Sequence, residues 1–557
     1  MRTTILSLIA LTAALLVGCQ GPSVDRQAQA FVDRHIAQIE PISTQINRTY
    51  WNATTTGKAD EFKKFEQYQV QLRQVYQSPE DFQKVKTFRA AGLKDPVLAR
   101  QIDKLYLAYL SNQIPADLMR QIVELDTRLQ ENYNNYRGTI DGRAVTMSEI
   151  YDLMTLEKNT PKRQQAWLAS KQVGNAIIDD FLKLIRLRNQ AARQLGFANF
   201  HEMTIVTGEQ DVAELDRIFQ EIDDLTREPY RKMKDELDTA LAAWYGIGVG
   251  ELMPWHYHDP FFQRTPLIYG IDLDAFYKDR DVKKLTIDYY AGVDLPVDDI
   301  IARSDLYDRE GKYPHAYGTD IDRKGDVRVL ANLQNTERWM ETLLHEVGHA
   351  LYSKYHDRRE SWLLREPAHS FMTESVAMFF GRLSRNPAWM QAMLKLSDEQ
   401  RKQIEPVTRK YFQFQEILFA RWALVMWNFE KALYADPEQD LNTLWWDLVE
   451  KYQFMRRPPG KPDAGWASKL HFTTAPCYYH NYMLGELLAS QFDHALIQSV
   501  LKLPAGSEHG YVGDPRIGKF FRDKVFGPGA KYTWNETIRR ATGEPLTAKY
   551  FVEQFLK

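Results

Sequence analysis

The most informative part of this sequence is the stretch WMETLLHEVGHAL, residues 339–351. Its apolar residues recur at three- and four-residue spacing, which predicts a helix with one buried face. His345 and His349 are four residues apart, so on a helix their imidazoles lie on one face, one turn apart. Such a pair can bind one Zn²⁺ ion, and Glu346 between them can take the proton of a water molecule. The stretch therefore predicts a catalytic zinc site; the alternative is a core helix with two hydrogen-bonded histidines.

A catalytic zinc ion takes three protein ligands and keeps one open position. The downstream sequence offers four carboxylates: Asp357, Glu360, Glu366 and Glu374. Two further histidines, His356 and His369, have no supporting spacing. Glu374 begins an apolar run, residues 375–380, where a carboxylate is costly unless something pairs with it. We predict that His345, His349 and Glu374 bind the metal; the alternative for Glu374 is a plain acid at a helix N-terminus.

The rest of the chain has the pattern of a helical protein. Its composition, 44% hydrophobic and 26% charged, is ordinary for a folded globular domain. Apolar spacing predicts helices at Glu61–Tyr76, Pro79–Ala91, Asp95–Leu110, Ala116–Tyr136 and Pro161–Leu195, the last stopped by Gly196. The best strand candidate is Val327–Asn332, and loops are expected near residues 254–270, 311–318 and 458–465. We predict the all-α class, with one mostly helical domain over residues 20–557 and two lobes around a cleft.

The first residues have the pattern of an export signal. Arg2 precedes an apolar run, Ile5–Val17, which is short for a membrane span, and Gly18-Cys19 follows it. The ending Leu-Val-Gly-Cys resembles a bacterial lipobox, so residues 1–19 are predicted to be a lipoprotein signal peptide with Cys19 as the lipidation site. Gln20 in place of Asp favours the outer membrane. We expect a periplasm-facing protein that meets the membrane only through this anchor; an ordinary signal peptide is the alternative.

Charge and cysteine content argue against other classes of protein. The net charge of −3 is spread along the chain, and no basic block predicts nucleic-acid binding. Cys477 is the second of two cysteines, so a lipidated Cys19 leaves it without a disulfide partner. No signature of a cysteine peptidase surrounds Cys477, and we do not expect it to be a nucleophile.

The zinc motif resembles that of the gluzincin oligopeptidases. The segment Leu344–Ala350, followed by Glu374, is similar to the angiotensin-converting-enzyme family of peptidyl-dipeptidases (M2) and to the thimet oligopeptidase and oligoendopeptidase F family (M3). The resemblance is scattered over most of the mature chain and is densest from about residue 310 to 500. It implies the mostly helical, two-lobed zincin fold of neurolysin and the converting enzyme, with one Zn²⁺ ion and short peptide substrates in a deep channel.

Several segments resemble the converting-enzyme family in particular. They are residues 189–193 with Gly196, His315-Ala316, Asp463-Ala464-Gly465, Lys469-Leu470-His471, Tyr479, Tyr482 and residues 491–496. The resemblance implies that Lys469 and Tyr479 hold the C-terminal carboxylate of the substrate. It also implies that the two histidines, His315 and His471, and Tyr482 contact the peptide and the oxyanion, with Ala316 beside the scissile bond.

The chemistry of these residue types agrees with the implied roles. A fixed carboxylate site needs a cation and a hydroxyl, which Lys469 and Tyr479 would supply. A developing oxyanion needs donors beyond zinc, and Tyr482 and His315 are suitable. The alternatives are that the tyrosines form a core aromatic patch and that Lys469 is a surface residue.

The sequence also departs from the converting-enzyme pattern. Asn481 stands where the family has an Arg that helps to hold chloride, so chloride dependence is doubtful. Met378 stands where the family has an Asp, four residues after the third ligand. The family's Gln of the carboxylate pocket has no clear counterpart; residues 255–258, Trp-His-Tyr-His, lie near its expected place.

Together these features predict a zinc metallopeptidase that acts on short peptides and releases C-terminal dipeptides. One alternative is an oligoendopeptidase of the thimet and oligoendopeptidase F type, which ignores the C-terminus of its substrate. Another, from a different class, is an inactive binding lipoprotein that keeps the same fold.

Overall fold

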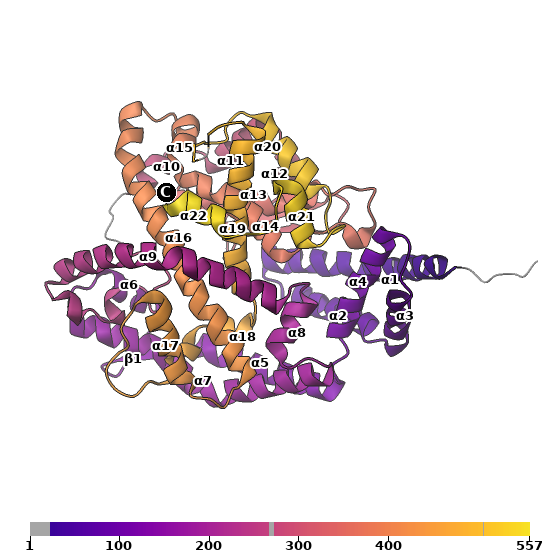
Figure 1. Cartoon of the computed structure of the whole chain (residues 1–557), viewed down its shortest axis with the longest axis horizontal. Helices are drawn as coiled ribbons and strands as arrows, with labels where there is room; N and C mark the ends of the chain where they lie inside the picture. The colour runs from indigo at the N-terminus through magenta and orange to yellow at the C-terminus, as the bar shows by residue number, and fades with distance from the viewer. Residues whose placement is uncertain (1–22, 267–271, 505, 557) are drawn as a thin grey trace, which may run out of the picture.

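The computed structural model describes residues 23–266, 272–504 and 506–556 (Figure 1). The predicted signal peptide and its Cys19 lie outside these residues, so lipidation stays a prediction. Within the described ranges, the search for a helix of sufficient length and apolarity to cross a membrane found none.

The N-terminal helices form a layer at one end of the molecule. They are α1 (Val24–Thr56), α2 (Ala59–Tyr76), α3 (Pro79–Ala90) and α4 (Pro96–Ser111). Local capping sets their starts: Ser78 and Asp95 each accept a backbone N–H of the first turn, and a proline follows each of them. Helices α1, α3 and α4 share a small core of their own, which Trp362 and Leu363 complete.

A second group of helices occupies the lower half of Figure 1. It consists of α5 (Ala116–Asn135), α6 (Met147–Leu156), α7 (Thr160–Gln194), α8 (Phe200–Thr207), α9 (Val212–Tyr245), α17 (Leu441–Gln453) and α18 (His471–Thr474), with a hairpin of β1 (Gly138–Ile140) and β2 (Arg143–Val145).

The third group occupies the upper half of Figure 1. It consists of α10 (Asp274–Tyr277), α11 (Val282–Gly292), α12 (Asp298–Arg303), α13 (Glu337–Lys354), α14 (Ser370–Gly381), α15 (Pro387–Leu394), α19 (His480–Ala495), α20 (Pro515–Phe520), α21 (Trp534–Thr542) and α22 (Lys549–Leu556). Strands β3 (Tyr317–Asp320) and β4 (Val327–Leu330) pair antiparallel in this group, with Gly318 opposite Val329.

Helix α16 (Asp398–Ala435) connects the two large groups, running from the upper into the lower half of the view. The main hydrophobic core is continuous through both groups and contains residues of α7, α13, α14, α16 and α19. Short single-turn segments link the helices: η1 (Val249–Glu251), η2 (Pro254–His256), η3 (Trp362–Leu364), η4 (Arg382–Arg385), η5 (Ala464–Ser468), η6 (Leu496–Val500) and η7 (Phe521–Phe526).

The predicted all-α class is confirmed. The predicted helices correspond to α2, α3, α4, α5 and α7, and each predicted end lies within two residues of the observed one. The predicted strand at Val327–Asn332 is β4, which ends two residues earlier. The β1–β2 hairpin was not predicted. Its turn is Asp141-Gly142, in which both residues have positive φ, as the type I′ turn of a two-residue hairpin requires. The strands have only three residues each, too few to show alternation in the sequence.

Candidate active site

Helix α13 places the two motif histidines side by side. Thr336 caps the helix by accepting the backbone N–H of Trp339 at 3.3 Å. Met340, Leu343, Leu344, Val347 and Leu351 are buried on the core side. The opposite side carries His345 and His349, whose Nε2 atoms are 3.2 Å apart. The amphipathic pattern thus fixes which way the imidazoles point.

Glu374 of α14 completes a three-residue group that we call the metal-ligand cluster: His345, His349 and Glu374. Their ligand atoms all lie within 4.8 Å of one another. Glu374 Oε2 is 3.7 Å from His345 Nε2 and 3.8 Å from His349 Nε2. Gly348 makes this possible, because a Cβ there would stand 3.0 Å from the Cα of Ala377 and hold α14 away from α13.

The metal-ligand cluster suits a divalent cation. Burial lowers the pKa of His345. Burial, and then the charge of His345, hold the pKa of His349 well below its usual value. Neutral imidazole is the form that binds metal. Burial also raises the pKa of Glu374, and its carboxylate lies within 4 Å of the ring nitrogens of these two histidines. Two nitrogens and one carboxylate at this spacing are the donor set of a catalytic zinc site.

Glu346 lies beside the cluster as a buried acid. Burial, and then the charge of Glu374, raise the pKa of Glu346 to about 8, while a backbone hydrogen bond from Gly318 of β3 opposes the rise. A carboxyl group poised near neutral pH is suited to accept and return a proton. A cation held by the metal-ligand cluster would favour its charged form.

The other downstream carboxylates are engaged elsewhere. The carboxylate of Glu366 forms ion pairs with Arg323 at 2.5 Å and with Lys104 at 2.6 Å. Burial raises the pKa of Glu366, but these two cations outweigh burial and lower the pKa to about 2. Asp357 pairs with Arg359 and Glu360 pairs with Lys531. The histidines are also separate from the cluster: His369 caps α14 and His356 is buried against Tyr352. Glu374 therefore remains the carboxylate that meets His345 and His349.

A partner of His349 was missed by the sequence analysis. Its Nδ1 lies 2.8 Å from the hydroxyl of Thr373, the residue before Glu374. Such a contact fixes the tautomer and ring orientation of a ligating histidine. Met378, at the position where the converting-enzyme pattern has an acid, faces the cavity described next instead. The signal was present, because Thr373 is the polar residue that precedes the ligand on the same helix turn.

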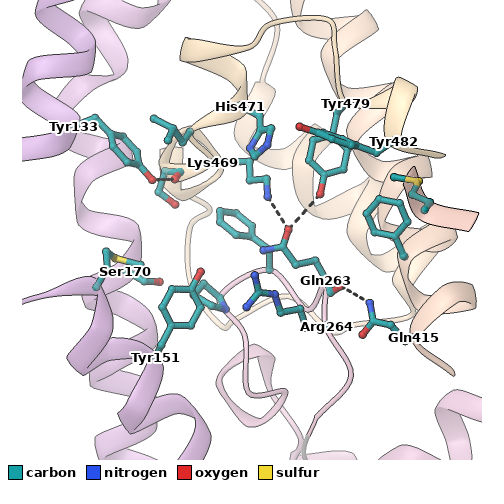
Figure 2. Close-up of a pocket in the computed structure, with 17 residues that line it drawn as sticks. Tyr133, Tyr151, Ser170, Gln263, Arg264, Gln415, Lys469, His471, Tyr479 and Tyr482 are labelled. Atoms are coloured by element: carbon teal, nitrogen blue, oxygen red, sulfur yellow. Dashed lines mark hydrogen bonds between the residues drawn. The ribbon is translucent and has the colours of Figure 1, made fainter. Parts of the chain in front are cut away.

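A cavity of about 520 Å³ lies between the two large groups of helices. Its walls come from α5, α6 and α7 on one side, from α14, α16 and α19 on the other, and from residues 260–264 and 468–471 (Figure 2). Met378 of α14 and Tyr482 of α19 belong to this lining. Met378 lies one helical turn beyond Glu374, so the cavity extends from beside the metal-ligand cluster.

Three polar residues from distant segments meet in this cavity. Lys469 Nζ donates to Gln263 Oε1 at 2.6 Å, and the hydroxyl of Tyr479 reaches the same oxygen at 3.4 Å (Figure 2). We call Lys469, Tyr479 and Gln263 the carboxylate clamp, because the amide oxygen of Gln263 occupies a place where a carboxylate oxygen would receive both donors. Burial lowers the pKa of Lys469 to about 8.

Gln263 was not among the predicted site residues. The expected neighbourhood, residues 255–258, lies apart from the cavity: His256 accepts the N–H of Met253 and contacts Thr160. The signal was weak, a single amide after two phenylalanines in a loop, and only the fold brings it to Lys469. Asp259 holds Gln263 by accepting its backbone N–H at 3.2 Å.

Neighbouring contacts hold the remaining clamp residues in place. The indole N–H of Trp422 donates to the hydroxyl of Tyr479 at 2.8 Å. Asn175 of α7 bonds both Asp463 and the backbone of Ala464, at the start of the segment that leads to Lys469. These bonds tie the 463–469 segment to α7 before substrate arrives, which lowers the entropy lost on binding.

His471 and Tyr482 line the same cavity, next to Tyr479 of the clamp. The His471 ring is 4.9 Å from that of Tyr479 and 6.2 Å from that of Tyr482. Burial and Lys469 lower the pKa of His471 to about 4, and its Nδ1 is buried without a hydrogen-bond partner in the described chain. Gly485, one turn after Tyr482, lets α19 approach α14, since a Cβ there would be 3.4 Å from the Cβ of Glu374.

The structure does not bring His315 into the cavity lining. His315 is exposed, next to Tyr313, in the segment that leads into β3, and Ala316 beside it is half-buried. Strand β3 packs on α13 through Gly318, so both residues lie along the edge of the metal helix rather than at the clamp. Their roles stay predictions.

Two further predictions concern Asn481 and Cys477. Asn481 is buried, and its Oδ1 accepts from Gln210, whose own amide oxygen contacts His480 at 2.8 Å. This network contains no fixed positive charge for chloride. Cys477 is buried, and burial holds the pKa of its thiol well above the usual value. A buried, protonated thiol is a poor nucleophile.

Comparisons with known proteins agree with this geometry. The family model of angiotensin-converting enzyme (peptidase M2) matches residues 23–246, and that of peptidase family M3 matches residues 301–556, which include the metal-ligand cluster. Each model matches less than half of the chain. The chain is thus related to both gluzincin families, as its motifs predicted, and it has their all-α zincin fold.

Two curated relatives show weaker similarity. One is an inactive angiotensin-converting-enzyme-related protein of Caenorhabditis elegans, 27% identical over 149 residues, which are 26% of this chain and 16% of that protein. The other is thermostable carboxypeptidase 1 of Pyrococcus furiosus, 24% identical over 259 residues, which are 43% of this chain and 51% of that protein. The matches span about half or less of these relatives.

Proposed function

We propose that this protein is a zinc peptidase that hydrolyses short peptides and releases dipeptides from their C-termini. One observation carries the proposal: Lys469, Tyr479 and Gln263, which could together hold a terminal carboxylate, line a cavity that also includes Met378, one helical turn beyond Glu374. A site that binds the end of a peptide near a hydrolytic centre favours an enzyme that cuts at a fixed distance from that end.

The residues divide the chemistry between them. A Zn²⁺ ion held by His345, His349 and Glu374 would act as a Lewis acid that polarises the scissile carbonyl and acidifies water. Glu346 takes a proton from the attacking water at its carboxylate and passes it to the nitrogen of the leaving amine. The hydroxyl of Tyr482, which makes no hydrogen bond in the described structure, donates to the carbonyl oxygen as it gains negative charge.

The clamp sets the register of cleavage. Lys469 supplies the charge, Tyr479 a hydroxyl, and the amide of Gln263 turns to present its N–H groups to the second carboxylate oxygen. His471, with an unpartnered buried nitrogen between the clamp and Tyr482, is placed to bond the peptide unit between them. The resemblance to the converting-enzyme family supports cleavage at the penultimate peptide bond.

A product map tests this function. The purified, zinc-loaded protein is given one peptide of about eight residues, as the free acid and as the C-terminal amide, and the products are identified by mass spectrometry. We expect C-terminal dipeptides from the free acid and a kcat/KM about ten- to a hundredfold lower for the amide, which lacks the charged contact.

The match to family M3 over residues 301–556 supports a second candidate, an oligoendopeptidase. In that case internal cuts would occur at equal rates in the acid and the amide. A protein that binds zinc stoichiometrically but cleaves neither peptide would instead point to a binding protein with this fold; the Caenorhabditis elegans relative is described as inactive.

A further inference from the structure

A second cation lies next to the carboxylate clamp. Arg264 directly follows Gln263 in the chain and lines the same cavity (Figure 2). Its side chain is exposed, so it faces the open space of the cavity rather than the core. Lys469 and Arg264 both belong to the lining, and none of the described lining residues is an Asp or a Glu.

Arg264 has no partner in the part of the chain that the structure describes. It makes no ion pair and no hydrogen bond there, whereas most of the arginines do. The nearest acid along the chain, Asp259, is buried and accepts the backbone N–H groups of Phe261 and Gln263, at 2.9 Å and 3.2 Å. An unpaired guanidinium inside a cavity is a binding group for a planar anion.

Tyr151 of α6 lies on the same side of the cavity. Its half-buried hydroxyl makes no hydrogen bond among the described residues, and it faces the cavity in Figure 2. Burial and the charge of Asp259 raise the pKa of Tyr151 to about 12, and the charge of Arg264 opposes this rise. The lining therefore contains the clamp pair, Lys469 and Tyr479, and a second cation and hydroxyl without partners among the described residues, Arg264 and Tyr151, which we call the second pair.

One peptide C-terminus uses only one of these pairs. Its two carboxylate oxygens are satisfied by Lys469, Tyr479 and Gln263, which leaves Arg264 without an ion-pair or hydrogen-bond partner among the described residues. The side chain of the last residue branches from the carbon that bears the terminal carboxylate, so it extends into the cavity that Arg264 and Tyr151 also line.

We propose that Arg264 and Tyr151 form a second carboxylate-binding subsite, which selects peptides whose C-terminal residue is aspartate or glutamate. This inference rests on the proposed function, because the clamp must hold the terminal carboxylate for the side chain to be placed there. It adds a substrate class: peptides that end in two negative charges match a cavity lined by two cations.

The experiment compares two N-acetylated peptides that differ only in their last residue, Glu or Gln. Glutamine has the shape of glutamate without its charge, so the ratio of kcat/KM values isolates the charged contact. We expect the wild-type ratio of Glu to Gln to be about ten or more. In Arg264→Gln the Glu-to-Gln ratio of kcat/KM should fall to near one, because the charged contact is lost. Arg264→Lys keeps the charge and should keep part of this ratio, and Tyr151→Phe should lower it about two- to fivefold.

Arg193→Gln is the matched control, because it removes the same charge from an exposed arginine of α7 that does not line the cavity. It should keep the wild-type ratio. A wild-type ratio near one would overturn the proposal. So would an equal loss for both peptides in Arg264→Gln, since Arg264 would then act on the terminal carboxylate that both share.

A binding measurement separates this proposal from the proposed function. Zinc-loaded Glu346→Gln protein, with and without Arg264→Gln, is titrated with the two peptides by calorimetry. A tenfold preference for the Glu peptide that Arg264→Gln abolishes supports the subsite whatever products the active enzyme releases. Equal binding of both peptides, together with normal dipeptide release, would leave the proposed function intact and remove the subsite.

Discussion

The metal-ligand cluster and the carboxylate clamp are neighbours in the fold but are built in different ways. Two of the three cluster residues stand one turn apart on α13, and the third enters from the next long helix, α14. The clamp joins Gln263 to Lys469 and Tyr479, which are 206 and 216 residues further along the chain. A local helical repeat therefore prepares the proposed hydrolytic centre, whereas only long-range packing creates the proposed site for the peptide end.

This difference predicts how each region responds to change. The cluster is held by the packing of α13 against α14, so a substitution there acts on metal binding or on chemistry directly. The clamp is held by hydrogen bonds among loops, so a substitution there alters which peptide is recognised and where it is cut. The experiments below test that separation, from the largest expected effect to the smallest.

Glu346→Gln should have the largest effect on turnover. An amide cannot accept the proton of the attacking water, so kcat should fall by about two to four orders of magnitude. Bound zinc, measured by metal analysis, should stay near one ion per chain, because Glu346 is outside the metal-ligand cluster. A variant that turns over at a near wild-type rate would remove Glu346 as the proton acceptor.

Glu374→Ala should weaken zinc binding by more than about 10–100-fold. That smaller range is the usual cost of losing a hydrogen-bond partner of a metal ligand rather than the ligand itself. Thr373→Val, which removes only the hydroxyl beside His349, sets that smaller scale. The matched control is Glu366→Ala: it should retain zinc, although it leaves Lys104 and Arg323 without their shared partner. Loss of zinc from Glu366→Ala with retention in Glu374→Ala would reverse the assignment.

Lys469→Ala should lower kcat/KM for free-acid peptides by about ten- to a hundredfold and cause little further loss with amidated peptides. Both changes delete the same charged contact, so their effects should not add. Zinc content should stay unchanged, which would show that the clamp and the cluster act separately. Additive losses would mean that Lys469 does not contact the terminal carboxylate.

Peptide recognition should weaken as the pH rises through about 8. Burial lowers the pKa of Lys469 to about 8, so the ammonium is charged below that pH and neutral above it. The ratio of kcat/KM for a free acid to that for its amide, measured with N-acetylated peptides, should fall toward one between pH 7 and 9.5. Taking the ratio cancels the titration of Glu346 and the metal site. A constant ratio over this range would contradict the assignment.

Chloride should have the smallest effect. The position that could hold a fixed cation is Asn481, whose amide is already engaged by Gln210. Activity in sodium chloride and in sodium salts of other anions, at equal ionic strength, should agree within about twofold. Saturable activation by chloride alone would show an anion site that this network does not provide.

The sequence was most informative where chemistry follows helical spacing. His345, Glu346 and His349 could be assigned from their spacing, because an α-helix brings positions i and i+4 together wherever it lies. Glu374 could be proposed from the cost of a carboxylate at the start of an apolar helix. Lys469, Tyr479 and Tyr482 came from resemblance, since nothing in their local pattern distinguishes them from an ordinary lysine and a core aromatic patch.

Other parts of the site could not be predicted from local pattern. Gln263 lies in a loop, where no periodicity fixes which way a side chain points, and its role depends on contacts more than 200 residues away. Thr373 precedes Glu374 in the sequence, but its contact with His349 depends on the packing of α14 against α13. His315 shows the reverse: its motif placed it at the substrate, while the structure leaves it exposed outside the cavity lining.

The sequence by itself predicted the helical class, which the structure confirms, and it led us to propose the metal-binding helix and its proton acceptor, because each depends on the periodic arrangement of residues within one element. The tertiary structure decided what surrounds that centre. Packing of α14 and α19 through Gly348 and Gly485 selected Glu374 and brought Tyr482 beside it. The fold also brought residues 263–264 and Lys469 into one cavity, whose lining is positively charged as a result. Contacts between such distant segments depend on the whole fold and leave no repeat in the sequence.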